Sequence, residues 1–322
     1  MMPSRALRLH AVAAVAFTLV VPAQLRATNP ILPGADPHAL RVGDVVWIYP
    51  TWNDGGGERF FGFSSTNLTD WTRRGPLLDL KDVSWVDDDG QSRHHAWAPS
   101  MLHHGGRYYF YYAVGPQNPT PSRIGVAVGD SPGGVFRDSG RPLLTGGRGF
   151  EAIDPMVFWD PASGRTYLYA GGSAGATLRV FELSPDFVSI AREVPVATPP
   201  QFTEGAFMHA RDGRYYLSYS HGSWRHASYS VHYATCDSPV GPWTYRGVIL
   251  SSDATRKGPG HHSILQLSGG GGWRIVYHRW EGQAGDGPYR GLRQICIDVM
   301  EYDAEGLLRP VRMTGGGEAD GR

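Results

Sequence analysis

The sequence has few of the features that would tie a protein to nucleic acid, to a membrane surface or to a disulfide framework. Its 30 acidic and 30 basic residues cancel, so no excess of positive charge is available to hold nucleic acid or anionic lipid. Only two cysteines, Cys236 and Cys296, occur in 322 residues. Both fall within apparent strands, so one disulfide and two buried thiols are equally good interpretations. The fold therefore cannot depend on disulfides.

Apolar runs long enough to cross a bilayer are also missing. Ala11–Val21 is an apolar run of only 11 residues. It follows Arg5 and Arg8, and small residues that suit a cleavage site, such as Ala23 and Ala27, come after it. This order is typical of an export signal. We therefore expect a secretory signal peptide at residues 1–27, a secreted or periplasmic mature chain, and neither a membrane nor a nucleic acid as partner.

Helical periodicity is absent outside this segment, and a hairpin recurs in its place. The 43 glycines and 24 prolines supply turns rather than helix interiors. In Thr203–Ser220, Glu204 precedes an apolar run, Asp212-Gly213 is suited to a tight turn, and Arg214–Ser220 is an aromatic strand. Equivalent units begin at residues 36, 98, 154 and 261. The chain is thus built from repeats of one supersecondary unit.

The spacing of these repeats predicts the fold class. Their starts lie 50 to 62 residues apart, and each unit holds three or four strands. Such a period is typical of a propeller rather than a sandwich. We predict an all-β fold, a five-bladed β-propeller over residues 28–316, with a disordered tail at 317–322. Because the innermost strand of every blade lines the central channel, residues at the starts of these strands should meet at one end of it.

Three of these meeting residues are acids: Asp36, Asp154 and Glu204. Asp36 and Asp154 both stand in Asp-Pro dipeptides and could be simple turn formers. Their combination with Glu204 at the corresponding place of a third unit favours a site. Hydrolysis of a glycosidic bond needs one carboxylic acid to protonate the leaving oxygen and one carboxylate to activate water or attack the sugar. A third acid nearby would raise the pKa of the proton donor.

Six segments in order resemble glycoside hydrolase family 43. They are NPILPGADP, AWAPS, IDPMVFWD, TEGAFMHARDGRYYLSYS, GPGHHS and RQICIDVMEYDAEG, and the resemblance extends from about Asn29 to Thr314. It implies a five-bladed propeller enzyme that acts on arabinose- or xylose-containing oligosaccharides and polysaccharides with inversion. It also implies that no cofactor is required, with a structural calcium ion in the central channel as an option.

The resemblance assigns roles to individual residues of this chain. Asp36 matches the general base, Glu204 the general acid, and Asp154 the aspartate that orients the acid and raises its pKa. Trp97 matches an aromatic residue at the mouth of the site, Arg293 falls near a substrate-contacting arginine, and His261 matches a histidine near the channel axis. Since calcium prefers oxygen ligands, His261 would reach such an ion through water.

Several activities remain open. We expect an exo-acting α-L-arabinofuranosidase, with β-xylosidase and endo-arabinanase as alternatives within the family. A retaining, fructan-acting propeller is less favoured, because its first aspartate follows asparagine, whereas Asp36 follows Ala35. A carbohydrate-binding propeller without catalysis would not need all three acids.

Other polar clusters suggest structural roles. The run Asp87-Asp88-Asp89 lacks the ligand spacing of a calcium loop, and we expect a solvated acidic turn. We expect His94-His95 to be surface or loop residues. Adjacent residues of a strand point to opposite faces, so His261 and His262 cannot easily share a metal ion.

Overall fold

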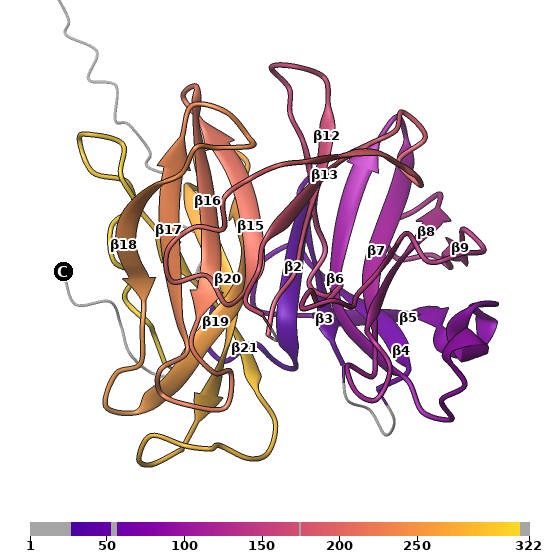
Figure 1. Ribbon diagram of the computed structural model, residues 1–322. Coiled ribbons are helices and arrows are strands. Elements are labelled where there is room, and N and C mark those ends of the chain that lie inside the picture. Colours follow the sequence, from indigo (N-terminus) through magenta and orange to yellow (C-terminus); the bar gives the residue numbers. More distant parts are fainter. Residues whose placement is uncertain (1–26, 53–56, 174, 316–322) are drawn as a thin grey trace, which may run out of the picture.

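The computed structural model describes residues 27–52, 57–173 and 175–315. Its strands form five antiparallel sheets, which Figure 1 shows as blades around a common centre. The predicted all-β five-bladed propeller is confirmed. The helical segments among the described residues are two short 3-10 turns, η1 (Leu80–Asp82) and η2 (Val86–Asp89). Two predictions fall outside the described residues: the signal peptide at residues 1–27, of which only residue 27 is described, and the tail at residues 317–322.

Each blade is a four-stranded antiparallel sheet, except that the outer edge of blade 2 is divided between two short strands. Blade 1 is β2 (Ala35–Val42), β3 (Val45–Thr51), β4 (Arg59–Ser65) and β5 (Thr72–Asp79). Blade 2 is β6 (His95–His104), β7 (Arg107–Gly115) and β8 (Arg123–Gly129), with β9 (Arg137–Asp138) and β10 (Leu144–Thr145). Blade 3 is β11 (Met156–Trp159), β12 (Thr166–Ala170), β13 (Arg179–Leu183) and β14 (Ile190–Val194). Blade 4 is β15 (Glu204–Arg211), β16 (Arg214–His221), β17 (Ser230–Cys236) and β18 (Thr244–Leu250). Blade 5 is β19 (Arg256–Gln266), β20 (Trp273–Glu281) and β21 (Gln294–Met300), joined by β1 (Leu32–Pro33).

The two ends of the chain close the ring. β1 pairs with β21 and completes blade 5, with Leu32 opposite Ile295. Just before it, buried Asn29 exchanges two hydrogen bonds with the backbone of Ile297, at 2.9 and 2.8 Å. The sequence left the fourth strand of this blade unplaced, because a two-residue strand has no periodicity to detect.

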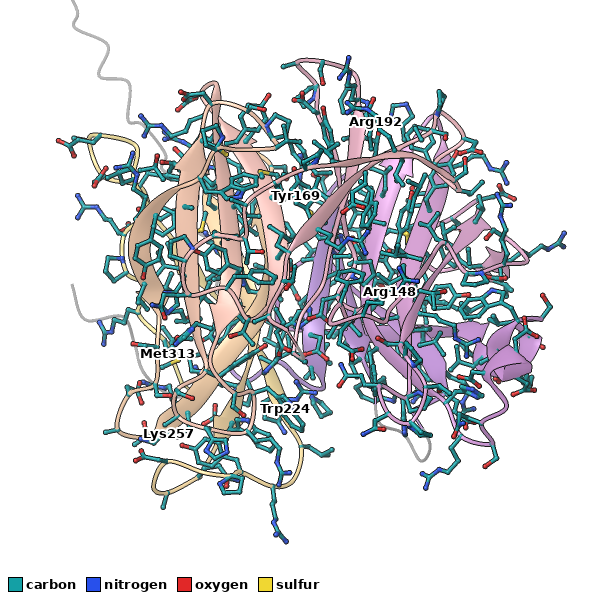
Figure 2. All side chains as sticks on the ribbon, in the orientation of Figure 1. Arg148, Tyr169, Arg192, Trp224, Lys257 and Met313 are labelled. Carbon is teal, nitrogen blue, oxygen red and sulfur yellow. The ribbon has the colours of Figure 1, made fainter. Side chains whose placement is uncertain are left out.

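The aromatic second strands are buried on both faces because they lie between neighbouring blades. On β7, Phe110 and Tyr112 join the core shared with blade 1, whereas Tyr111 joins the core shared with blade 3. All three side chains are fully buried. Figure 2 shows side chains filling the space between blades, with Tyr169 of β12 among them. Burial of such rings supplies much of the favourable free energy of folding.

Two polar predictions need correction. Asp87 and Asp88 are exposed, as expected of a solvated turn, but Asp89 is not: its carboxylate accepts hydrogen bonds from Arg123 at 2.7 Å and His94 at 3.0 Å. The prediction was wrong for Asp89, because the guanidinium of Arg123 is itself buried and needs an anion. His94 is a loop residue, as expected, but it is buried rather than on the surface, and His95 begins β6.

Both cysteines, Cys236 and Cys296, are free and buried, so the thiol interpretation is the correct one. No helix among the described residues is long and apolar enough to cross a membrane.

A backbone feature recurs where each innermost strand begins. Each blade has a residue in a left-handed conformation here, with φ between 39° and 61°: Asp36, Ala98, Asp154, Gly205 and His261, with Gly258 as a second one in blade 5. The strand register slips at this point in blades 1, 2, 4 and 5, as in a β-bulge. Such conformations cost about 1–3 kcal/mol for residues other than glycine and cluster at functional sites. The bulge re-aims its side chains into the mouth of the channel.

Candidate active site

A pocket of about 300 Å³ opens where the innermost strands begin. It is lined by Asp36, Thr51, Trp97, Gln117, Ile153, Asp154, Ser173, Glu204, Trp224, His261 and Arg293. All six residues that the sequence pointed to are in this list, and they come from every blade of the ring. One refinement concerns blade 4, where the left-handed residue is Gly205. Glu204 is therefore one position earlier than Asp36 and Asp154 in their own repeats.

Asp36 is buried among positive and polar groups. Its Oδ1 lies 2.9 Å from Arg293 Nη1 and 3.4 Å from His261 Nδ1. Its backbone N–H donates to His278 Nδ1 at 3.1 Å. Burial alone would raise the pKa of this carboxyl, but Arg293, with His261 and His278, outweighs burial and holds the pKa well below its ordinary value. Asp36 is therefore ionised at any pH near neutrality.

Asp154 has the opposite electrostatic setting. Its Oδ2 accepts a hydrogen bond from the Gly205 N–H at 3.1 Å and lies 3.6 Å from His261 Nδ1. Burial raises its pKa to about 7, opposed by His261 and assisted by the negative charges of Glu204 and Asp36. A proton is thus shared within this cluster of acids near neutral pH.

Glu204 is held by two hydroxyl donors. Ser173 Oγ donates to Oε2 and Tyr229 Oη to Oε1, each at 2.7 Å. Burial raises the pKa of Tyr229 well above its ordinary value, so this phenol stays protonated and remains a donor. A Cβ on Gly172 would lie 2.5 Å from Glu204 Cβ, and one on Gly260 would lie 2.2 Å from the Tyr229 ring. Only glycine leaves room for this arrangement.

The two adjacent histidines of β19 separate, as predicted. His261 Nδ1 lies between the carboxylates of Asp36 and Asp154. His262 is buried elsewhere, with Nε2 2.6 Å from Ser218 Oγ. The two imidazoles therefore do not share a site.

The described residues provide no set of direct protein ligands for the calcium ion that the resemblance offered as an option and that His261 would contact through water. Within residues 27–52, 57–173 and 175–315, no group of three or more histidine, cysteine or acidic side chains is arranged to hold a metal ion. The guanidinium of Arg293 and the imidazole of His261 approach the same oxygen of Asp36. A divalent cation there would meet a fixed positive charge already paired with the carboxylate.

Sequence patterns missed four residues of the site: Ser173, Trp224, Tyr229 and His278. Ser173, Trp224 and Tyr229 lie in loops that follow the second strand of their blade, and His278 lies near the end of such a strand. A second antiparallel strand ends where the first begins, so its last residues reach the same mouth. That rule would have found His278 at the end of β20 and Trp224 just after β16.

The arrangement is suited to acid–base chemistry on a small polar ligand. The pocket combines Asp36, whose carboxylate is held ionised, Glu204, whose carboxyl is fixed by two hydroxyl donors, and Asp154, whose pKa is raised. Trp97 and Trp224 supply aromatic faces against which a sugar ring can stack. General acid and general base catalysis on opposite sides of one bond needs such a set.

Comparison with known proteins gives consistent matches. The profile of "Glycosyl hydrolases family 43" matches residues 27–308. The Beta-D-galactofuranosidase xynD of Aspergillus niger is 35% identical, over 90% of this chain and 86% of that protein. A xylosidase/arabinosidase of Bacteroides ovatus is 29% identical, over 86% and 95% of the two chains. The structure of an α-L-arabinofuranosidase from Clostridium thermocellum, 30% identical, covers 87% of this chain and 94% of its own with a TM-score of 0.69.

Proposed function

The chain belongs to family 43 of the glycosyl hydrolases, an inverting family, and from this membership we propose that it is an exo-acting α-L-arabinofuranosidase. The observation that supports this most is the meeting of Asp36, Asp154 and Glu204 in one pocket of about 300 Å³ that is lined by residues of all five blades. A pocket of this size suits a single terminal sugar unit better than the interior of a chain. The substrate is then an arabinose-containing oligosaccharide or polysaccharide.

In this proposal Asp36 is the general base and Glu204 the general acid. Arg293 and His261 keep Asp36 ionised, so it can take a proton from the attacking water. Glu204 protonates the leaving oxygen, and Ser173 and Tyr229 stabilise the carboxylate that remains. Inversion requires a gap of roughly 6.5–9.5 Å between the two carboxyl groups, which leaves room for water.

Asp154 acts through Glu204 rather than on the substrate. Its raised pKa means that a proton is held in this corner of the pocket near neutral pH. The N–H of Gly205, next to Glu204, fixes the distance between the two acids.

A second candidate is hydrolysis of β-D-galactofuranosides. It is favoured by the 35% identity with the galactofuranosidase of Aspergillus niger over most of both chains. α-L-arabinofuranose and β-D-galactofuranose have the same ring configuration, and galactofuranose carries one additional hydroxymethyl group. Room for that group beyond the ring would decide between the two furanosides. β-xylosidase activity is a third candidate, suggested by the relative from Bacteroides ovatus.

A panel of 4-nitrophenyl glycosides tests the proposal. We expect the highest kcat/KM on the α-L-arabinofuranoside, a lower value on the β-D-galactofuranoside, and little release from the β-D-xylopyranoside or from fructan. Glu204→Gln and Asp36→Asn should each lower kcat/KM by about 100-fold or more. Asp88→Asn, at an exposed acid of η2, is the matched control and should retain activity.

Other outcomes would contradict parts of the proposal. Near-normal turnover in either variant would refute the role of that residue. Release from linear arabinan without release from the aryl glycosides would indicate endo action. A folded protein that binds sugars and cleaves none would be a carbohydrate-binding propeller.

A further inference from the structure

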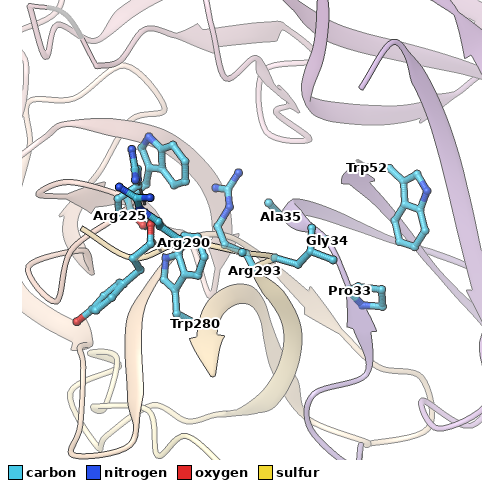
Figure 3. A pocket seen from close by; sticks show the side chains of 12 residues that line it. Pro33, Gly34, Ala35, Trp52, Arg225, Trp280, Arg290 and Arg293 are labelled. Atoms are coloured by element: carbon cyan, nitrogen blue, oxygen red, sulfur yellow. Dashed lines mark hydrogen bonds between the residues drawn. The ribbon is translucent and has the colours of Figure 1, made fainter. Parts of the chain in front are cut away.

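A second pocket, of about 340 Å³, lies beside the catalytic pocket and shares Trp224 and Arg293 with it (Figure 3). Its lining also includes Trp52, Arg225, Trp280, Tyr289 and Arg290. Trp280 belongs to β20, and the other four follow β3, β16 and β20 at the same end of the channel as Asp36. In Figure 3, Trp52 stands on one side and Trp280, Arg225 and Arg290 on the other, with Arg293 between them.

The aromatic wall of this second pocket is held in place by specific contacts. The rings of Trp224 and Trp280 stack, with centroids 6.1 Å apart and planes at 14°. Trp280 Nε1 donates to the Trp224 carbonyl at 2.8 Å. The Tyr289 N–H donates to the Arg225 carbonyl at 2.6 Å, and Arg225 Nε donates back to the Tyr289 carbonyl at 3.1 Å. The loop after β16 and the loop after β20 therefore form one preformed surface.

Arg293 forms the partition between the two pockets. Its guanidinium lies 4.6 Å from the centroid of the Trp224 ring while Nη1 pairs with Asp36 at 2.9 Å. A ligand that fills the catalytic pocket and continues past this pair enters the second pocket directly. The two cavities are thus consecutive parts of one binding site.

The second pocket carries positive charge that no lining carboxylate neutralises. Its lining contains three arginines and neither aspartate nor glutamate. Arg293 is paired with Asp36, but Arg225 and Arg290 form no ion pair with an acid of the described chain. The acid at the end of β20, Glu281, is paired with Arg279. The guanidinium groups of Arg225 and Arg290 therefore remain available beside the tryptophan side chains of the second pocket.

We propose that this second pocket binds the leaving-group side of the substrate and selects a sugar unit that carries a carboxylate, that is, a uronic acid. The assignment to the leaving-group side rests on the proposed exo action, because a single terminal unit then occupies the catalytic pocket. The apolar face of a sugar ring stacks on tryptophan, and a guanidinium binds a carboxylate through a planar pair of hydrogen bonds. Trp224, which is 40% exposed and is backed by the buried ring of Trp280, supplies the first interaction, and Arg290 with Arg225 the second.

Binding without catalysis gives the first test. Purified protein is titrated with D-galacturonate and with D-galactose while tryptophan fluorescence is followed, since three tryptophans line the pocket. We expect the uronate to bind roughly three- to ten-fold more tightly at low salt, as for one partly exposed ion pair. The difference should shrink in 0.5 M NaCl, where the Debye length is only about 4 Å.

Variants assign the effect to the pocket. Arg290→Gln should remove most of the preference for the uronate, and the double variant with Arg225→Gln should abolish it. Arg107→Gln, at an exposed arginine beginning β7 at the other end of blade 2, is the matched control and should keep the preference. Equal binding of the two sugars, or a preference unchanged in Arg290→Gln, would overturn the proposal.

The same sugars, used as inhibitors of 4-nitrophenyl glycoside hydrolysis, separate this proposal from the proposed function. Inhibition by the uronate at lower concentration than by galactose is expected. Hydrolysis without this preference would leave the function standing and refute the subsite. A binding preference in a protein that releases no terminal sugar would refute the exo assignment, and with it the placement on the leaving-group side.

Discussion

Arg293 provides the positive charge closest to the proposed base. Its Nη1 is 2.9 Å from Asp36 Oδ1, and both groups are largely buried. The sequence placed Arg293 near the site as a substrate contact and could not indicate this pairing. The two residues are 257 positions apart, and only closure of the ring between blades 5 and 1 brings them together.

Replacing Arg293 should change the pH dependence of catalysis. The pKa of Asp36 is held low, so removal of the cation in Arg293→Gln lets that pKa rise. The base must be ionised, and the acidic limb of the kcat/KM profile should therefore move to higher pH. Arg293→Lys keeps a charge and should shift the limb less.

The matched control is Arg290→Gln, three residues earlier on the same loop and without a contact to Asp36. Its acidic limb should coincide with that of the unchanged protein. If the acidic limb of the kcat/KM profile were the same in Arg293→Gln, Arg293 would not be the group that keeps Asp36 ionised.

The hydroxyl donors to Glu204 should support the step in which it gives up its proton. Tyr229→Phe removes the hydrogen bond to Oε1, and Ser173→Ala the one to Oε2. Hydrogen bonds to a charged group are stronger than those to a neutral one, so both hydroxyls stabilise the carboxylate that proton transfer leaves behind. We expect each variant to lower kcat by about ten-fold with a smaller change in KM. An unchanged kcat in both variants would show that these hydroxyls do not assist the proposed acid.

At the scale of the strand, the bulge that begins each blade explains how side chains of a sheet reach the channel mouth. The left-handed residue is an acid in blades 1 and 3 and a histidine in blade 5, where it costs strain. In blade 4 it is Gly205, and Glu204 before it carries the function. Spacing along the sequence predicted the hairpins well, and the aromatic strand expected at Arg214–Ser220 is β16, one residue longer. It could not reveal this one-residue offset, because a bulge leaves no periodic pattern.

Gly172 tests how tightly the loop after β12 fixes the proposed acid. An added Cβ would lie 2.5 Å from Glu204 Cβ and 3.2 Å from Ile153 Cδ1, so Glu204 must shift. A displacement of about 1 Å in a catalytic group can cost about 100-fold. We expect Gly172→Ala to lower kcat/KM by roughly that factor while the circular dichroism spectrum is retained.

The control for Gly172→Ala is Gly213→Ala in the β15–β16 turn. Its Cβ would meet nothing within 4 Å, and its φ of +79° disfavours alanine. This variant should lose about 1 kcal/mol of stability and keep its activity. Full activity in Gly172→Ala would show that the position of Glu204 does not depend on this contact.

At the scale of the whole molecule, the site exists only because five repeats close into a ring. The repeat period was enough to predict the number of blades and the meeting of Asp36, Asp154 and Glu204. The contacts that close the ring were not predictable, since β1 has two residues and its pairing with β21 depends on the shape of the completed fold.

Asn29 tests the contribution of closure to stability. Its side chain bonds to the backbone of Ile297 and to the side chains of Asp298 and Thr314, and it is 1% exposed. Asn29→Ala would leave buried partners unsatisfied, at a cost of about 2–4 kcal/mol. For a domain of this size, Tm should fall by roughly 5–15 °C in a thermal scan. Asn118→Ala, at an exposed asparagine, should leave Tm nearly unchanged, and an equal fall in both variants would contradict this role.

The stereochemistry of the first product tests the central proposal most directly. Cleavage of 4-nitrophenyl α-L-arabinofuranoside is followed by proton NMR from the first turnovers, before the free sugar equilibrates. With Asp36 activating water on the face opposite the leaving group that Glu204 protonates, the first sugar to appear should be β-L-arabinofuranose. Appearance of the α anomer first would show retention and assign Asp36 a nucleophilic role, in contradiction to this mechanism.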